Sequence, residues 1–254
     1  MNVPEHTPSP EGAYGAPDYA RGFPPDYHRH FWHQARLAIV HQELARLRPT
    51  GAVLDVGCGP GQYVRALRQR GYNAIGCDPG DVSVDHDLVG RVFARTTAED
   101  LPAAVRSAVG VVLLLDVLEH LADPVSMLAA LGRTLPHVRA AIVTVPARQE
   151  LWSTLDERAG HHRRFQVTEL SALVGAAGLV VIDARYLFRA LYPAAWLGRG
   201  RVRPRGIRPP GYPAVHAIAG RLLALEARVL PASVRGTSAL CVARFPRSQE
   251  RRAS

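Results

Sequence analysis

An aspartate, three alternating glycines and a second aspartate form the strongest chemical pattern in this sequence. Asp55 ends the apolar run that opens the segment VLDVGCGPG at residues 53–61. Three glycines follow it at alternate positions, Gly57, Gly59 and Gly61. Glycines allow a tight turn and let a ligand lie against the backbone, because no Cβ intervenes. Asp78 ends the next apolar run, where a carboxylate can accept both hydroxyls of a ribose. The pattern predicts a site for a nucleoside-containing cofactor.

The spacing of the glycines separates two classes of cofactor. A dinucleotide site requires G-x-G-x-x-G, but the third glycine position, counted from Gly57 and Gly59, is Gln62. This disfavours an NAD(P)-dependent oxidoreductase, which remains the alternative on a similar sheet. The segment D-x-G-x-G-x-G instead resembles motif I of the class I S-adenosylmethionine (SAM)-dependent methyltransferases. In that family an acid in the position of Asp55 helps to hold the ammonium group of SAM, and the glycines make room for its sulfonium arm.

Two further segments extend the resemblance, which covers most of the chain from about Phe31 to Arg244. The sequence TAEDLP at residues 97–102 is similar to the segment that holds the adenine in this family. The sequence DVLEH at residues 116–120 is similar to the end of the family's fourth strand, beside the reacting methyl group. The resemblance therefore implies that Ala98, Glu99 and Asp116 belong to the cofactor site.

Three histidines are candidate catalytic bases. Methyl transfer to a hydroxyl requires a base within hydrogen-bond reach, and histidine titrates near neutral pH. His120 follows the fourth expected strand, although it could equally cap or pack there. His161 and His162 stand in GHHRRF, residues 160–165, which resembles a stretch of one bacterial subgroup of methyltransferases. That subgroup also has an aromatic N-terminal helix, matched here by FWHQAR at residues 31–36.

A divalent metal is the other interpretation of this region. Asp116, Glu119 and His120 resemble the E-x-x-E-H motif of ubiquinone-pathway O-methyltransferases, which holds a divalent cation. However, the sequence DVLEH is also widespread in methyltransferases that use no metal. Arg163 and Arg164 would repel a cation near the histidine pair, so we predict substrate binding or base catalysis there and no metal site.

Alternating apolar and amphipathic segments must position these residues. Strands are expected at residues 52–57, 73–78, 92–96, 110–116, 139–145, 179–186 and 238–245, with helices between them. This order predicts an α/β fold, a Rossmann-like, mostly parallel sheet of seven strands with helices on both faces. The resemblance implies that the last strand is antiparallel and that a helical insertion precedes it.

The domain organisation follows from composition and charge. We expect a disordered tail over residues 1–25, one methyltransferase domain over 26–246 with a basic insertion at 187–236, and a basic tail over 247–254. Residues 1–184 carry 17 arginines and 20 acids, net −3, whereas 185–254 carry 14 arginines and 2 acids, net +12. The chain contains no lysine.

The insertion contains an apolar stripe with helical spacing. Its members recur at intervals of three and four residues, at Val215, Ile218, Leu222, Leu225 and Val229. Such a stripe usually packs on the protein's own sheet. Alternatively, it belongs to a basic amphipathic cap that contacts an anionic membrane or a lipid-linked substrate.

These observations predict a SAM-dependent methyltransferase that acts on a small-molecule or lipid-linked acceptor, with oxygen as the expected methylated atom. A non-catalytic SAM-fold binding protein is a further alternative. Nucleic acid is not expected as a partner, because the chain lacks the [N/D]-P-P-[Y/F] motif after the fourth strand. We found no signal peptide pattern and no apolar run of membrane-spanning length, so we expect a cytoplasmic location, with peripheral membrane contact as an option.

Overall fold

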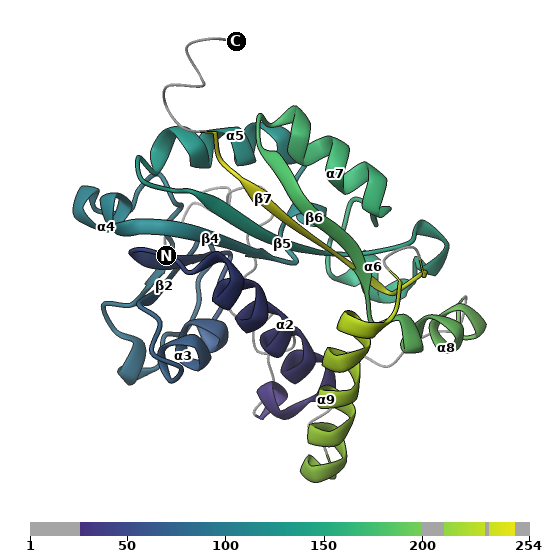
Figure 1. The fold of residues 1–254 in the computed structure, drawn as a ribbon. Helices are drawn as coiled ribbons and strands as arrows, with labels where there is room; N and C mark the ends of the chain where they lie inside the picture. The colour runs from purple at the N-terminus through teal and green to yellow at the C-terminus, as the bar shows by residue number, and fades with distance from the viewer. Residues whose placement is uncertain (1–25, 200–210, 232–233, 247–254) are drawn as a thin grey trace, which may run out of the picture.

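The computed structural model describes residues 26–199, 211–231 and 234–246 and contains a seven-stranded mixed sheet (Figure 1). Its strands are β1 (Ala52–Val56), β2 (Ala74–Asp78), β3 (Val92–Ala94), β4 (Val109–Leu115), β5 (Ala140–Pro146), β6 (Val180–Leu187) and β7 (Ser238–Arg244). They lie in the order β3-β2-β1-β4-β5-β7-β6, and β7 runs antiparallel to both of its neighbours. The predicted fold class is confirmed, although β3 ends two residues earlier than expected.

Helices cover both faces of the sheet. The described helices are η1 (Tyr27–Arg29), α2 (Phe31–Leu47), α3 (Gln62–Arg68), η2 (His86–Leu88), α4 (Ala103–Ala108), η3 (Leu118–His120), α5 (Pro124–Thr134), η4 (Gln149–Leu151), α6 (Thr154–Arg158), α7 (Val167–Ala176), η5 (Arg189–Leu191), α8 (Tyr192–Leu197) and α9 (Pro213–Val229). One core cluster joins the sheet to α5 and α7, and another joins it to α2, α3 and α9. Every residue of β4 is buried, as expected for a central strand covered on both sides.

The strand order reverses between β1 and β4, and this reversal positions the candidate site. β1 pairs in parallel with β2 on one side and with β4 on the other. The carboxyl ends of the three strands therefore meet at one edge of the sheet. Ligands of open α/β sheets bind at this edge, in the crevice where the strand order reverses.

The insertion contributes η5, α8 and α9, and α9 packs along α2 (Figure 1). The buried face of α9 includes three small residues, Gly220, Ala224 and Ala227. The expectation that the apolar stripe packs on the protein's own sheet is wrong, because its five side chains are 52–67% exposed. Small residues let the two helices approach closely, and the five large apolar residues of the stripe point outward, whereas Leu223 is buried.

Several sequence expectations concern residues outside the described ranges. The tails at 1–25 and 247–254 lie there, as does the arginine-rich part of the insertion at 200–210. Among the described residues, no helix is both long and apolar enough to span a bilayer.

Candidate cofactor and catalytic site

The glycine loop follows β1 and leads directly into α3. Gly57, Gly59 and Gly61 all have positive φ, at 73°, 52° and 83°, a region that side chains with a Cβ rarely adopt. A Cβ on Gly57 would lie 2.8 Å from Val117 Cγ2, and one on Gly61 would lie 2.5 Å from Val92 Cγ2. The loop therefore needs glycine for its backbone conformation and for its packing against the ends of neighbouring strands.

Asp78 lies at the end of β2 and fixes the loop. Its Oδ2 accepts a hydrogen bond from the Gly59 amide at 2.8 Å, and its Oδ1 accepts one from the Gly80 amide at 2.8 Å. The carboxylate lies at the carboxyl end of β2, the position expected for a residue that accepts ribose hydroxyls. The geometry is compatible with the predicted ribose role and adds a structural one, because the same carboxylate orients the glycine loop.

Asp55, at the end of β1, is buried beside Asp78 and Arg36. Burial raises the pKa of Asp55 to about 7, with Arg36 opposing the shift and Asp78 adding to it. The carboxyl is therefore poised between its two protonation states near neutral pH. A cationic group brought next to it would favour the carboxylate.

Arg36 of α2 is the main residue of this region to which the sequence analysis gave no role. Its guanidinium forms an ion pair with Asp116 and donates from Nε to the Tyr63 hydroxyl at 2.6 Å. It also stacks on the Trp32 ring, 4.1 Å from the centroid. Although burial opposes its charge, the carboxylate of Asp116 keeps the pKa of Arg36 above its ordinary value. The first half of α2 thus closes the carboxyl edge of the sheet over β1 and β4.

Asp116 follows β4 and is held by its neighbours. Its φ is 61°, and its Oδ1 accepts a hydrogen bond from Thr144 Oγ1 at 3.1 Å. Left-handed aspartates are tolerated better than most residues and occur often at functional sites. The pairing with Arg36 occupies the other carboxylate oxygen, so any contribution of Asp116 to a cofactor is made through a carboxylate already anchored on two sides.

The segment expected to hold an adenine follows β3 and lies in a turn. Thr97 Oγ1 donates to Asp100 Oδ2 at 2.6 Å, which closes the turn. Between them, Ala98 is buried and Glu99 is exposed. The predicted adenine contacts of these two residues stay a prediction.

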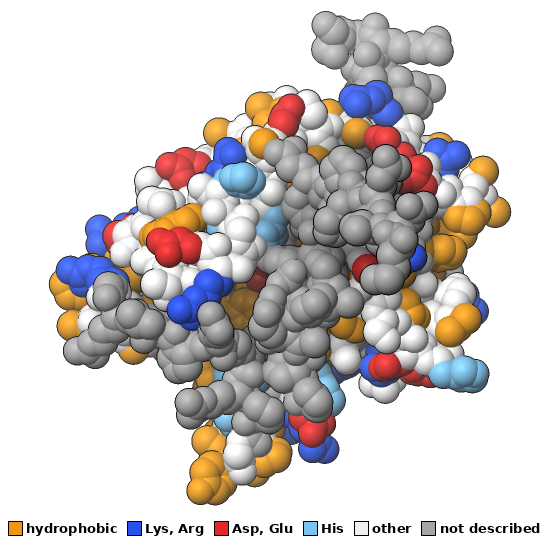
Figure 2. Space-filling view, turned by 180° about the vertical axis from the view of Figure 1, so that it is seen from behind, with side chains coloured by type: hydrophobic (Ala, Val, Ile, Leu, Met, Phe, Trp, Pro, Cys, Tyr) orange, Lys and Arg blue, Asp and Glu red, His pale blue; other side chains and the backbone are white. Residues whose placement is uncertain are grey.

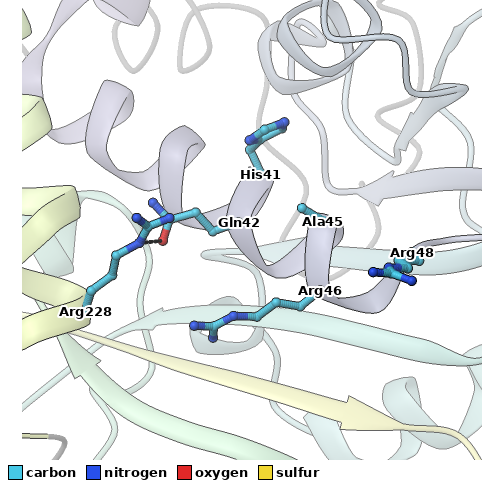
Figure 3. A pocket seen from close by; sticks show the side chains of 6 residues that line it. All are labelled: His41, Gln42, Ala45, Arg46, Arg48 and Arg228. Carbon is cyan, nitrogen blue, oxygen red and sulfur yellow. Dashed lines mark hydrogen bonds between the residues drawn. The ribbon is translucent and has the colours of Figure 1, made fainter.

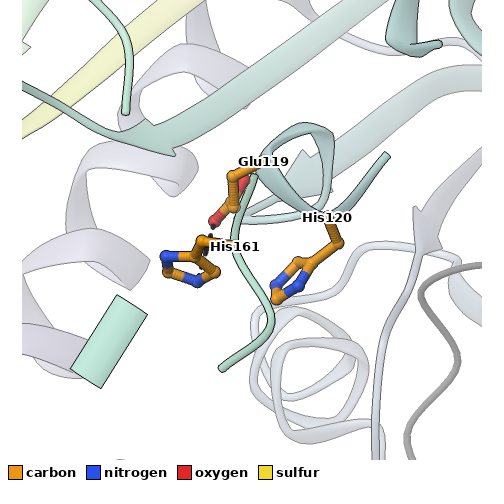
Figure 4. A group of neighbouring side chains, drawn as sticks. All are labelled: Glu119, His120 and His161. Atoms are coloured by element: carbon orange, nitrogen blue, oxygen red, sulfur yellow. Dashed lines mark ion pairs between the residues drawn. The ribbon is translucent and has the colours of Figure 1, made fainter. Parts of the chain in front are cut away.

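His120 and His161 come together at the carboxyl edge, although 41 positions separate them (Figure 4). Their ring centroids lie 4.7 Å apart in an edge-to-face arrangement. Burial lowers the pKa of His120 to about 4, with His161 adding to the effect. His162 is exposed instead, and its backbone amide donates to the Glu119 carbonyl at 2.8 Å. The structure therefore unites two of the three candidate bases.

Asp156 of α6 orients His161, and the sequence analysis did not identify it. Its Oδ1 lies 2.9 Å from His161 Nδ1, and Arg164 donates to both carboxylate oxygens, at 2.8 and 3.0 Å. Burial opposes the charge of Asp156, but hydrogen bonds from His161 and Arg164 hold its pKa well below the ordinary value. An ionised Asp156 accepts the Nδ1 proton, so the lone pair of a neutral His161 is on Nε2, which lies 3.9 Å from the buried Glu119 Oε1 (Figure 4).

Glu119 completes the group shown in Figure 4. It is fully buried, and neither carboxylate oxygen has a hydrogen-bond partner among the described residues. Burial, reinforced by Asp116, raises the pKa of Glu119. Ligand atoms of Glu119, His120 and His161 lie within 4.8 Å of one another, so this set could hold a divalent cation. The metal alternative in the sequence analysis named Asp116 instead of His161, but Asp116 pairs with Arg36.

A surface hollow of about 680 Å³ lies elsewhere, between the C-terminal parts of α2 and α9 (Figure 3). It is lined by His41, Gln42, Ala45, Arg46, Arg48 and Arg228. α2 ends at Leu47, just before β1 begins at Ala52, so this hollow is at the amino edge of the sheet. It is distant from the glycine loop and contributes nothing to the candidate site.

The fold and the edge site together define an α/β protein of the nucleoside-cofactor class. The family described as "Methyltransferase domain" matches residues 28–184. The chain belongs to this family, which confirms the recognition of a class I SAM-dependent methyltransferase.

Curated relatives match part of the chain. The ubiquinone biosynthesis O-methyltransferase of Hahella chejuensis is 37% identical over 105 residues, covering 39% of this chain and 43% of the relative. The protein of the same name from Pseudomonas aeruginosa strain UCBPP-PA14 is 30% identical over 151 residues, covering 52% of this chain and 65% of the relative. The matched part of this chain therefore spans 43% and 65% of the lengths of these two relatives.

Solved structures show the same fold at low sequence identity. The cyclase SpnF matches with a TM-score of 0.50 and 20% identity, covering 84% of this chain and 81% of its own. The plantazolicin methyltransferase BpumL, solved with S-adenosylhomocysteine, matches with a TM-score of 0.50 and 14% identity, covering 91% of this chain and 89% of its own. These likenesses concern the fold alone.

Proposed function

We propose that this protein transfers the methyl group of SAM to a hydroxyl oxygen of a small-molecule or lipid-linked acceptor. The observation that carries the proposal is the pairing of His161 with Asp156 beside the cofactor edge. SAM already contains an activated methyl group, so the protein must align the acceptor and remove its proton. An oriented imidazole supplies the base that a hydroxyl nucleophile needs. Most amine nucleophiles do not need such a base.

In the proposed reaction, His161 Nε2 removes the proton of the acceptor hydroxyl. The oxygen attacks the methyl carbon in line with the S–CH3 bond, which breaks to give a methyl ether and S-adenosylhomocysteine. Asp156 keeps the Nδ1 proton in place and stabilises the imidazolium that forms, as in other carboxylate–histidine pairs. Asp78 holds the ribose, and Asp55 receives the ammonium group of the cofactor.

The acceptor class is supported by the matched relatives, whose names specify O-methylation in ubiquinone biosynthesis. We place the acceptor of this chain among hydroxyl compounds that are small or carry a lipid tail. We further propose that the protein works at the edge of an anionic membrane.

The proposed transfer predicts that purified protein, given SAM labelled with tritium in the methyl group, labels an acceptor in a metabolite fraction from cells that lack the gene. Mass spectrometry of the labelled product should show that the methyl group is attached to an ether oxygen. Label found on nitrogen or carbon, or no label in any fraction, would overturn O-methylation. Addition and chelation of Mg²⁺ in the same assay tests the metal alternative for Glu119, His120 and His161.

The base assignment makes a sharper prediction with this labelled acceptor. His161→Ala should lower turnover about 100-fold or more while SAM affinity stays unchanged. His162→Ala is the matched control, because this exposed neighbour should retain nearly full activity. Asp156→Asn should also lower turnover, because the carboxylate that orients the His161 ring through Nδ1 is lost. Full activity of His161→Ala would exclude this base.

A further inference from the structure

The outward face of α9 is apolar, although the helix lies on the surface. Five side chains recur along it, Val215, Ile218, Leu222, Leu225 and Val229, and each is 52–67% exposed. We call these five residues the α9 stripe. Because an α-helix rises 1.5 Å per residue, the stripe is about 21 Å long. Exposed apolar surfaces of this continuity mark contact sites on soluble domains, whereas isolated apolar residues do not.

The packing of α9 explains why the stripe faces outward. A Cβ on Gly220 would lie only 3.0 Å from Gln34 Cβ and from the Phe31 carbonyl oxygen, so α9 and α2 are in close contact there. Leu223, Ala224 and Ala227 continue the buried face. The helix is therefore anchored by its small residues, and no described segment covers the stripe. Hydrophobic side chains gather at the lower tip of the molecule in Figure 2, where Figure 1 has the beginning of α9.

The charges around the stripe are basic. Arg221 is exposed on the same helix beside the stripe, whereas the exposed Arg228 turns toward α2 and donates from Nε to Gln42 Oε1 at 2.9 Å. The helix contains one acid, Glu226, which is buried and accepts hydrogen bonds from the backbone amides of Arg189 and Ala190. Asp26, the residue before η1, forms an ion pair with Arg29 at 3.8 Å. The outward face of α9 therefore presents apolar and cationic groups without an exposed acid of its own.

The sequence on the N-terminal side of α9 adds further positive charge. Five arginines occur between residues 199 and 208, only a few positions before Pro213, and four of them lie outside the described residues. Exposed Trp196, Leu197 and Tyr212 bracket this segment in sequence. Aromatic rings and arginines close in sequence to an apolar stripe are typical of helices that lie in the plane of a membrane interface.

From these observations we propose that the α9 stripe inserts into the headgroup region of an anionic bilayer while the exposed Arg221 of the same helix binds its phosphates. This inference rests on the proposed function only for the reason why membrane binding would be useful, namely access to a lipid-linked acceptor. α9 packs on α2, whose Arg36 holds Asp116 at the cofactor edge, so docking by α9 would leave one helix, α9 itself, between the bilayer and the helix that closes the site. A lipid-linked hydroxyl acceptor could then reach the site from the bilayer.

The test is co-sedimentation of the full-length protein with vesicles. Vesicles of phosphatidylcholine with and without phosphatidylglycerol are compared at about 10 mM and 150 mM salt, where the Debye length falls from about 30 to 8 Å. We expect binding to vesicles that contain phosphatidylglycerol, weakened by salt. The double variant Leu222→Gln, Leu225→Gln should bind at least tenfold more weakly at both salt concentrations. Replacing Arg221 with Gln should reduce the salt-dependent part.

Matched controls separate the surface from general effects. Val89 is 69% exposed in a different part of the molecule, so Val89→Gln should leave binding unchanged. All variants should keep the wild-type melting temperature and SAM affinity, which also separates failure of this inference from failure of the proposed function. Absence of binding to anionic vesicles at low salt would overturn the inference. So would a stable dimer in solution that the double leucine variant dissociates, because a second copy would then cover the stripe.

Discussion

At the scale of single residues, the candidate site consists of carboxylates whose charge states are set by different neighbours. Asp156 is kept ionised by Arg164 and His161, whereas burial raises the pKa of Asp55 and of Glu119. The three side chains have the same carboxyl group but differ in charge state. Asp156 is an anion that orients His161, whereas Asp55 and Glu119 take up protons readily. Such divergence is typical of sites that bind cations or move protons.

The raised pKa of Asp55 makes cofactor binding sensitive to pH. Because the SAM ammonium group favours the carboxylate, binding should release a proton below pH 7, and affinity should rise about tenfold per pH unit up to the pKa of about 7. Calorimetry between pH 5.5 and 7.5, in buffers of different ionisation enthalpy, measures both effects. Asp55→Asn should abolish the proton release. Equal affinity of the wild type at pH 5.5 and 7 would contradict the assignment.

The same shift affects the stability of the free protein with the opposite sign. The pKa of Asp55 is above its ordinary value of 3.8, so the folded state retains a proton that the unfolded chain has lost. This contribution to the free energy of unfolding is fully present below the unfolded pKa and is lost as pH rises to about 7. Cofactor binding and stability of the free protein therefore favour opposite ends of this pH range.

At the scale of elements, α2 connects the two unusual parts of the molecule. Its first half holds Asp116 through Arg36, and its outer side receives α9 through Gly220. The buried ion pair between Glu43 of α2 and Arg185 of β6 joins the same helix to the sheet. A change in the α2–α9 contact should therefore affect stability first and the site second.

The close contact of the two helices predicts that Gly220→Val destabilises the fold. The added side chain meets Gln34 Cβ and the Phe31 carbonyl oxygen, and overpacking of this kind costs about 1–3 kcal/mol. Gly175→Val is the matched control, because Gly175 is also helical but a Cβ there meets nothing within 4 Å. Urea denaturation of both variants measures the difference. Equal stability of the two would show that Gly220 is not required for packing.

At the scale of the whole molecule, binding of the correct cofactor should stabilise the fold. A ligand that binds only the folded state at about 100 times its Kd adds about 2.7 kcal/mol to the free energy of unfolding. Thermal melts should show a higher Tm with SAM, no change with NAD or NADP, and loss of the SAM effect in Asp78→Ala. Stabilisation by a nicotinamide cofactor instead would revive the oxidoreductase alternative.

The whole chain also separates its charges, with an acidic cofactor domain and a strongly basic C-terminal quarter. The acidic part suits a cofactor that carries positive charge at nitrogen and sulfur. The basic part includes α9, the helix that also has the exposed apolar stripe. Because the two charges lie on different elements, the proposed membrane contact would not compete with the cationic cofactor.

The sequence by itself determined the features that depend on short stretches of chain. The strands follow from apolar runs, and the glycine loop follows from the conformations that only glycine adopts easily, so Asp55 and Asp78 could be placed at strand ends in advance. Tertiary structure decided the contacts between distant segments, such as Arg36 with Asp116 and His161 with His120. It also decided which face of α9 is buried, because helical spacing defines a stripe, whereas the close approach of Gly220 to α2 determines the side from which α9 packs.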